Sequence, residues 1–450
     1  MKKTLSLALA LLLCLSLFSL AQAEEPEVIT LPDGSAIDLG GMEIIVGDWW
    51  SSGEETEPTT AQEEATADYR AWIQDTYNFK IKQQSVSSWD GIPEFFTNFA
   101  TSGGAENYVI IMRPGTLAAP MNSGLFYDLA SLGVFDFEDS KWNSATTSLM
   151  TKGESIYGMR PLEGEPREGV FFNKRLLTEA GVDPESLYEM QAAGTWNWAA
   201  FEELCAKLTR DLNNDGTVDV YALTSFGPRF IGASIASNGG EFVGIDENGK
   251  YFNATGSDNF MEAANWAAGI ISKYEYPQPE GSNWDYAEAA FYNGEVAMSI
   301  HQDYFASTLY QNMEDDYGFV AFPKGPKNET YVNVWTDNVY VIPACYDADR
   351  AWKIAFAFNL FTNPTPGYDD EDDWKTGFYA KYRDTRSVDE TIAMLRSDDH
   401  AVTWLEGMVS GYDLGPDFYW DVAALAMTPA EKLESVKAQW QAYLDAANGQ

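Results

Sequence analysis

The chain has few cysteines and few basic residues. After an apolar N-terminal run that contains Cys14, only Cys205 and Cys345 remain, which is too few for the disulfide framework of a small secreted scaffold. One disulfide bridge is possible, but two thiols are favoured. Lys and Arg number 28 against 69 Asp and Glu, and the formal net charge is −41. The negative electrostatic potential of so acidic a chain repels nucleic acid, anionic lipid and acidic solutes. We therefore expect no nucleic-acid partner and a neutral or cationic ligand.

Familiar catalytic motifs are also absent. The sequence contains no H-E-x-x-H, C-x-x-C, G-x-S-x-G or Walker loop, and its histidines are His301 and His400 alone. The sequence therefore lacks the usual motifs of metal-dependent hydrolases, serine hydrolases and nucleotide-dependent enzymes. We assign no catalytic residue, and His301 is treated as structural. A glycoside hydrolase stays open, because it needs only two carboxylates beside the scissile bond.

The chain has one long apolar run, at its N-terminus. Residues 1–23 begin with Lys2 and Lys3 and end with the small-residue pattern Ala21-Gln22-Ala23, which is typical of a cleaved secretory signal peptide. Cys14 follows Leu13 rather than a small residue, so we predict no lipid anchor. No later stretch reaches the ~20 apolar residues of a membrane helix. We expect a soluble, extracytoplasmic protein that starts at Glu24, with 24–41 as an N-terminal extension.

Strand and helix patterns alternate along the first part of the chain. "MEIIVGDWW" (42–50), "FKIKQQSV" (79–86) and "YVIIM" (108–112) are β-type runs, and the segments between them carry helical spacing. Later segments with helical spacing lie at 199–209, 259–274, 286–292 and 350–361, and Thr428 with Glu431 forms a capping box before a closing helix. This alternation predicts an α/β fold with mostly parallel sheets covered by helices. Trp72, Trp352 and Trp440 lie on helical stripes, so we assign them to the core.

The stretch "DLNNDGTVDVY" spaces oxygen-bearing side chains as a calcium loop does. The candidate ligands are Asp211, Asn213, Asp215, Thr217 and Asp219, arranged around Gly216. Ala222 occupies the position of the bidentate glutamate, and the residues that follow favour a strand, so the loop is no calcium sensor. A structural Ca²⁺ and a metal-free Asx turn are the two interpretations. In either case the loop joins a helix to a strand.

Five stretches in order resemble the extracellular solute-binding proteins (family 1) of bacterial ABC importers, which include maltose-binding proteins. They are "GVFFNKRLLTEAGV", "GTWNWAAFEELCAKLT", "AEAAFYNGEVAMSI", "YGFVAFPKGP" and "NVYVIPACYDADRAWKIAFAFNLFTNP". The resemblance implies a two-lobe, type II-like periplasmic-binding-protein fold that closes by a hinge on a ligand between the lobes. It places lobe 1 at 42–165 plus 302–332 and lobe 2 at 168–300 plus 334–447. It also implies a monomer that binds a carbohydrate and delivers it to membrane permease subunits.

A sugar site needs flat aromatic rings for stacking and polar side chains for paired hydroxyl hydrogen bonds. Such residues follow predicted strands or occur where the resemblance implies a cleft wall. The candidates are Trp49, Trp50, Trp89, Arg113, Phe230, Gln302, Asp303, Trp335, Asp337, Tyr419 and Trp420.

Each aromatic candidate has core packing as its alternative role, and of the adjacent pair Trp49 and Trp50 only one is expected to face the cleft. For the whole protein, the alternatives are a secreted glycoside hydrolase and the same fold with a peptide or cation as its solute.

Overall fold

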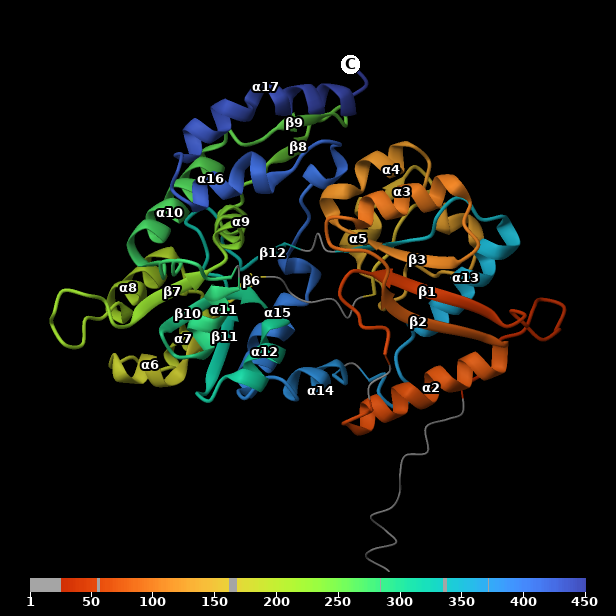
Figure 1. The fold of residues 1–450 in the computed structure, drawn as a ribbon, viewed down its shortest axis with the longest axis horizontal. Coiled ribbons are helices and arrows are strands. Elements are labelled where there is room, and N and C mark those ends of the chain that lie inside the picture. Colours follow the sequence, from red (N-terminus) through yellow and green to blue (C-terminus); the bar gives the residue numbers. More distant parts are fainter. Residues whose placement is uncertain (1–25, 55–56, 162–167, 284, 335–337, 371) are drawn as a thin grey trace, which may run out of the picture.

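The computed structural model describes residues 26–54, 57–161, 168–283, 285–334, 338–370 and 372–450. The predicted signal peptide, 1–23, lies outside these residues. The described chain forms two α/β lobes, each built around its own sheet and its own hydrophobic core (Figure 1). Among the described helices, none is both long and apolar enough to cross a membrane.

Lobe 1 is built on a four-stranded sheet in the order β13-β3-β1-β2. Strands β1 (Met42–Asp48), β2 (Phe79–Ser85) and β3 (Asn107–Met112) are parallel, and β13 (Val339–Val341) runs antiparallel to β3. Strand β3 is buried from Tyr108 to Met112, as expected for a strand covered by helices on both faces. The helices and short elements of this lobe are α2 (Ala61–Tyr77), α3 (Ile92–Ser102), η1 (Pro114–Thr116), α4 (Ala118–Asn122), η2 (Leu129–Leu132), α5 (Ser144–Leu149), the β4–β5 hairpin (Thr151–Lys152, Ser155–Ile156) and α13 (Ala348–Phe361).

Lobe 2 is built on a second four-stranded sheet in the order β11-β6-β10-β7. Strands β7 (Tyr221–Ser225), β10 (Val296–Gln302) and β11 (Tyr317–Ala321) point the same way, while β6 (Glu168–Asn173) is antiparallel to its neighbours. The helices of the first part of this lobe are α6 (Lys174–Glu179), α7 (Ser186–Ala192), α8 (Trp198–Leu208), α9 (Gly227–Ser237), α10 (Asp258–Tyr274), α11 (Tyr286–Tyr292) and α12 (Phe305–Asn312). The prediction of an α/β fold with sheets flanked by helices is therefore confirmed in both lobes. The sheet of lobe 1 is mostly parallel, whereas in lobe 2 β6 makes two of the three strand pairs antiparallel.

The C-terminal part of the chain completes lobe 2. Its elements are α14 (Trp374–Tyr379), η3 (Ser387–Ile392), α15 (Ala393–Leu395), η4 (Asp398–His400), η5 (Glu406–Met408), η6 (Gly415–Tyr419), α16 (Trp420–Ala423) and α17 (Pro429–Ala447), and its strand β14 (Ala401–Val402) pairs with β12 (Asn333–Val334). A further two-stranded pair, β8–β9 (Val243–Ile245, Tyr251–Asn253), lies between α9 and α10. Helix α17 begins with the predicted capping box, in which Thr428 and Glu431 satisfy each other's backbone N–H groups. Trp440 is fully buried, as predicted.

The expected division of the chain between the lobes differs from the structure. Segment 302–332 was assigned to lobe 1, but β10 runs on to Gln302 and β11 pairs with β6, so this segment belongs to lobe 2. Segment 334–447 was assigned to lobe 2, but β13 pairs with β3 and α13 packs in the core of lobe 1. The reason is that strand partners far apart in sequence, not local patterns, decide lobe membership. The chain therefore passes between lobes at 161/168, 334/339 and 361/374.

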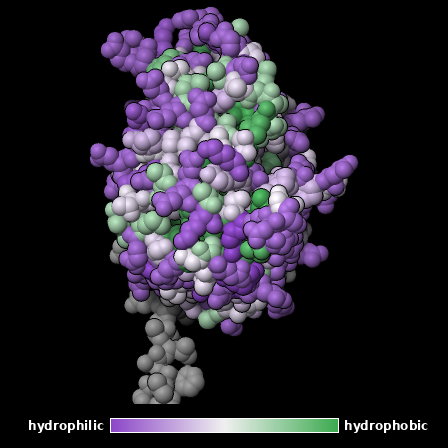
Figure 2. Space-filling view, turned by 90° about the vertical axis from the view of Figure 1, so that its left-hand side faces the viewer, coloured by the Kyte–Doolittle hydropathy of each residue, from purple (hydrophilic) through white to green (hydrophobic). Residues whose placement is uncertain are grey.

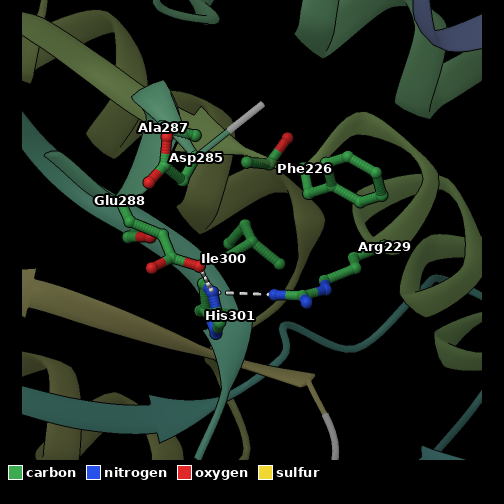
Figure 3. A pocket seen from close by; sticks show the side chains of 9 residues that line it. Phe226, Arg229, Asp285, Ala287, Glu288, Ile300 and His301 are labelled. Atoms are coloured by element: carbon green, nitrogen blue, oxygen red, sulfur yellow. Dashed lines mark hydrogen bonds and ion pairs between the residues drawn. The ribbon is translucent and has the colours of Figure 1, made fainter. Parts of the chain in front are cut away.

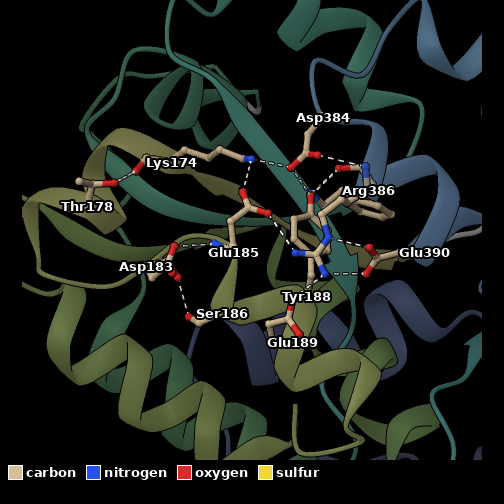
Figure 4. A network of polar contacts seen from close by, with 12 residues as sticks. Lys174, Thr178, Asp183, Glu185, Ser186, Tyr188, Glu189, Asp384, Arg386 and Glu390 are labelled. Atoms are coloured by element: carbon tan, nitrogen blue, oxygen red, sulfur yellow. Dashed lines mark hydrogen bonds and ion pairs between the residues drawn. The ribbon is translucent and has the colours of Figure 1, made fainter.

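A polar network attaches residues 384–390, which follow the last passage of the chain between the lobes, to the rest of lobe 2 (Figure 4). Lys174 contacts Glu185 at 2.8 Å and Asp384 at 2.6 Å, and the Arg386 guanidinium lies 4.7 Å above the Tyr188 ring. Arg386 also pairs with carboxylates of Glu185, Glu189 and Glu390. Hydrogen bonding to Lys174 lowers the pKa of Glu185. Networks of this kind hold a segment in register better than isolated surface pairs do.

Two further expectations are resolved in the described chain. Cys205 and Cys345 are free thiols, as favoured, and burial raises the pKa of Cys205.

The N-terminal extension packs on lobe 1 from residue 26 onward, where Ile37 and Leu39 are buried and the Ile29 N–H donates to the Tyr77 hydroxyl. The outer face of lobe 2 is mostly hydrophilic (Figure 2), in keeping with the acidic composition.

Candidate functional site

The two sheets turn the carboxyl ends of their parallel strands toward the loops that carry most candidate residues. In lobe 1 these ends are Asp48, Ser85 and Met112, and in lobe 2 they are Ser225 and Gln302. In open α/β sheets, ligands bind outside the carboxyl ends of the strands. The Asp48 carboxylate accepts hydrogen bonds from the Trp50 N–H at 3.0 Å and from Gln83 Nε2 at 2.8 Å, which fixes the turn after β1.

The lobe 1 side presents exposed tryptophans and one arginine. Trp50 is 53% exposed and meets Trp49 edge to face at 4.8 Å, while Trp49 packs against the lobe 1 core. Of the adjacent pair, only Trp50 is exposed, and the expectation that one of the two faces the cleft stays a prediction. Trp89 is 54% exposed, and the Arg113 guanidinium lies 3.6 Å from the centre of its ring. Burial lowers the pKa of Arg113, whereas the nearby Asp90 and Asp413 act in the opposite direction. A cation held over an indole face is rigid and still able to donate.

On lobe 2, Trp420 and Tyr419 lie side by side at the junction of η6 and α16. Trp420 is 49% exposed and packs edge to face on Phe226 at 5.6 Å. Tyr419 is half-buried against Phe242, and burial together with the Glu406 and Glu168 carboxylates raises its pKa. Gln302 Nε2 donates to Glu168 Oε1 at 3.3 Å, which joins the end of β10 to the start of β6.

The lobes touch where η5 of lobe 2 meets η1 of lobe 1. A Cβ atom at Gly407 would lie 2.6 Å from the carbonyl oxygen of Pro114, so only glycine permits this approach. The neighbouring Met408 packs against the lobe 1 core. Since Arg113 of lobe 1 is influenced by the charge of Asp413 of lobe 2, this arginine lies on the side of its lobe that faces lobe 2.

Segment 404–412 supplies functional candidates that sequence reasoning missed. Glu406 Oε2, Trp404 Nε1 and Tyr412 Oη are buried atoms with no hydrogen-bond partner in the described chain, and Arg113 Nε is another. Burial raises the pKa of Glu406 to about 7. Buried polar atoms without partners are rare in folded proteins and mark places where a ligand or water completes the bonding. The sequence could have pointed to Trp404 and Tyr412, because both are aromatic residues close to the predicted site residues Tyr419 and Trp420.

One sequence-predicted site residue is wrong. Phe230 is fully buried in lobe 2, where its ring lies 5.5 Å from that of Trp266 and 5.6 Å from that of Phe322. It faces inward because α9 is buried along nearly its whole length after Arg229. Asp303 is 2% exposed, and its backbone carbonyl accepts a hydrogen bond from Tyr382. Trp335 and Asp337 lie outside the described residues.

The loop from Asp211 to Asp219 is an exposed Asx-rich turn between α8 and β7. The Gly216 N–H donates to Asp211 Oδ2 at 2.9 Å, and the Asp215 N–H donates to Asn213 Oδ1 at 2.8 Å. The Thr217 N–H donates to Asp215, and the Leu212 N–H donates to Asp219. Across the described residues, no three His, Cys, Asp or Glu side chains are grouped so that they could hold a metal ion. Calcium binding by this loop stays a prediction.

Comparison with known protein families decides the class. The family model described as bacterial extracellular solute-binding protein matches residues 52–358, which is more than half of the chain. The chain belongs to this family. It is therefore an extracytoplasmic solute-binding protein rather than an enzyme, and the glycoside hydrolase alternative is not supported. No curated protein sequence matches it significantly.

Solved structures share the fold of this solute-binding protein at low sequence identity. An ABC substrate-binding protein from Listeria monocytogenes in complex with cycloalternan has 16% identity and a TM-score of 0.63, over 90% of this chain and 99% of that one. The maltose/maltodextrin-binding domain from Bdellovibrio bacteriovorus bound to maltotriose has 13% identity and a TM-score of 0.60, over 91% and 100%. UgpB from Mycobacterium tuberculosis, in complex with glycerophosphocholine, has 15% identity and a TM-score of 0.62, over 90% and 99%. The two-lobe fold is thereby confirmed.

Proposed function

We propose that this solute-binding protein captures an oligosaccharide between its lobes and delivers it to the permease of an ABC importer. The observation that carries the proposal is the presence of exposed indole rings on both lobes together with buried, unpartnered polar atoms in Arg113 of lobe 1 and in segment 404–412 of lobe 2. Trp50 and Trp89 project from lobe 1 and Trp420 from lobe 2, each about half exposed. Pyranose rings offer apolar faces to such rings and a rim of hydroxyls to the polar atoms.

The unpartnered atoms match the chemistry of sugar hydroxyls. Glu406 Oε2 needs a donor, whereas Arg113 Nε and Trp404 Nε1 need acceptors. A hydroxyl group both donates and accepts, so a sugar satisfies all three kinds of atom with one functional group. A simple cation would satisfy Glu406 and leave the two donors unpaired, which is a buried polar cost of about 1–3 kcal/mol per group.

Similar structures support the same solute class. The proteins with this fold were solved with cycloalternan, maltotriose and, in another case, mannotriose at 18% identity and a TM-score of 0.59. UgpB with glycerophosphocholine shows that the fold also serves a non-sugar solute. In this proposal the protein acts as a monomer, is exported through cleavage after Ala23, and meets membrane permease subunits once closed.

Isothermal titration calorimetry against malto-, manno-, cello- and chito-oligosaccharides tests the proposal. We expect one series to bind with stoichiometry near one and to raise the melting temperature, since a ligand that binds only the folded state stabilises it. Reducing-sugar release should stay at background. Binding of polyamines or peptides with no response to any saccharide would overturn the proposal.

A further inference from the structure

A small pocket opens in lobe 2 beside the aromatic wall of the cleft, at the carboxyl ends of β7 and β10. It lies between α9 and α11, and its lining includes Phe226, Arg229, Glu288, Ile300 and His301 (Figure 3). Phe226 is the residue on which Trp420 packs at 5.6 Å. Arg229 also bonds to Tyr304, whose side chain is 36% exposed just beyond the end of β10. The pocket is therefore contiguous with the proposed sugar-binding cleft.

Arg229 is held in place by two neutral groups. Its Nη1 lies 2.8 Å from His301 Nε2, and its Nη2 donates to the Tyr304 hydroxyl at 2.8 Å. Burial lowers the pKa of His301 to about 4, so the ring is neutral. Within the described chain, no carboxylate forms an ion pair with Arg229. The guanidinium is thus positioned, charged and available to an acceptor from outside.

Glu288 and Arg229 compete for the same nitrogen. Glu288 Oε1 lies 3.1 Å from His301 Nε2, the atom that also faces Arg229. A neutral imidazole nitrogen either carries a proton and donates or lacks one and accepts. It cannot accept from Arg229 and donate to Glu288 together. One of the two side chains therefore lacks its partner until another group enters the pocket.

The floor of the pocket is apolar. Ile300 is fully buried and Ala287 is 8% exposed, and the Phe226 ring stands at the opposite wall (Figure 3). An occupant that can both accept from Arg229 and donate to Glu288 completes whichever side chain His301 leaves unpaired, and a small apolar body would cover the floor. A protonated amine can donate to Glu288 but has no acceptor for Arg229, and a carboxylate can accept from Arg229 but has no donor for Glu288. A hydroxyl both donates and accepts but leaves the apolar floor uncovered.

We propose that this pocket receives the acetamido group of an N-acetylhexosamine residue. The amide carbonyl accepts from Arg229, the amide N–H donates to Glu288, and the methyl group covers Ile300 and Ala287. The inference rests on the proposed function and narrows its solute to oligosaccharides that contain an N-acetylated sugar.

The test compares three β-1,4-linked trisaccharides that differ only at C2. These are chitotriose with acetamido groups, cellotriose with hydroxyls and the chitosan trimer with free amines, each titrated calorimetrically into the full chain. We expect chitotriose to bind about tenfold or more tightly than either of the others. In Arg229→Ala and in Glu288→Ala the affinity ratio between chitotriose and cellotriose should shrink severalfold, while Trp420→Ala should weaken both ligands and leave the ratio in place.

The outcomes separate the inference from the function on which it rests. If cellotriose, or a malto- or manno-oligosaccharide, binds as well as or better than chitotriose, the acetamido pocket is wrong and the oligosaccharide receptor stands. The same holds if the preference for chitotriose survives both pocket substitutions. If no saccharide binds, the proposed function falls and the inference falls with it. Melting curves of each variant establish that the ratios come from folded protein.

Discussion

The position of the candidate site depends on single residues. The surroundings of each residue explain whether its role could be predicted from the sequence. Trp420 begins α16 directly after η6 and is half exposed, so its ring is accessible and its role in the site stays a prediction. Phe230 was predicted as a site residue too, yet it turns inward beside Phe322. Neighbouring positions on a helix point about 100° apart, and composition does not tell which of them packs inward. Glu406 gave no sequence signal, because its importance comes from burial without a partner.

Trp420→Ala should weaken oligosaccharide binding and leave the fold intact. Removal of a stacking ring should lower affinity by roughly 1–3 kcal/mol, the range for burial of a large apolar side chain. Because Trp420 is about half exposed without ligand, stability should change little. Calorimetry and urea unfolding measure both quantities. Tyr310→Ala is a matched control, since Tyr310 is 57% exposed at the end of α12 that leads to the start of β11, away from the cleft. Loss of several kcal/mol of stability in Trp420→Ala would instead place this ring in the core.

Glu406→Gln should change how stability depends on pH. Burial raises the folded-state pKa of Glu406 to about 7, above the value of about 4.3 expected when unfolded. The folded protein therefore binds more protons than the unfolded chain between these values, so this group favours folding at low pH and opposes it as pH rises toward 7. Urea unfolding at about pH 5 and about pH 8 should show the variant gaining stability relative to the parent at the higher pH. An equal difference at both pH values would contradict the burial of this carboxylate.

Elements of secondary structure were predicted better than their partners. The strands at 42–48 and 79–85, the capping box of α17 and the buried helix α13 follow from local spacing and capping chemistry. Strand β13 has just three residues, yet its pairing with β3 moves the whole of α13 into lobe 1. Local pattern carries no information about a partner more than two hundred residues away, which is why the division of lobes was wrong.

The loop between α8 and β7 carries the prediction of calcium binding. If Ca²⁺ is held there, it should raise the melting temperature, and Asp215→Ala should abolish the increment, because a methyl group cannot replace a central carboxylate ligand. Differential scanning calorimetry with Ca²⁺ and with EDTA measures the effect. Asp246→Ala is the matched control, since Asp246 caps a different exposed turn through the Asn248 and Lys250 N–H groups. A melting curve that EDTA leaves unchanged would mean that the loop is a metal-free turn.

At the scale of the molecule, we expect closure of the lobes to depend on the contact between η1 and η5. Gly407→Ala should hold the lobes apart, because its Cβ would lie 2.6 Å from the Pro114 carbonyl oxygen, a backbone atom that cannot easily move. Small-angle scattering should then show a larger radius of gyration with saturating ligand, and affinity should fall. Gly115→Ala, within η1 itself, meets nothing within 4 Å and is the matched control. Equal scattering of Gly407→Ala and its parent would show that this contact does not limit closure.

The three crossings between the lobes also govern when each lobe can fold. Lobe 1 begins at β1 but lacks its edge strand and a covering helix until residues 339–361 have emerged. Pairing over so long a separation is slow to form. We therefore expect the N-terminal half of the chain to remain incompletely folded until residues 339–361 have been made. The interleaved order of the lobes would thus make the folding of lobe 1 depend on a late part of the chain.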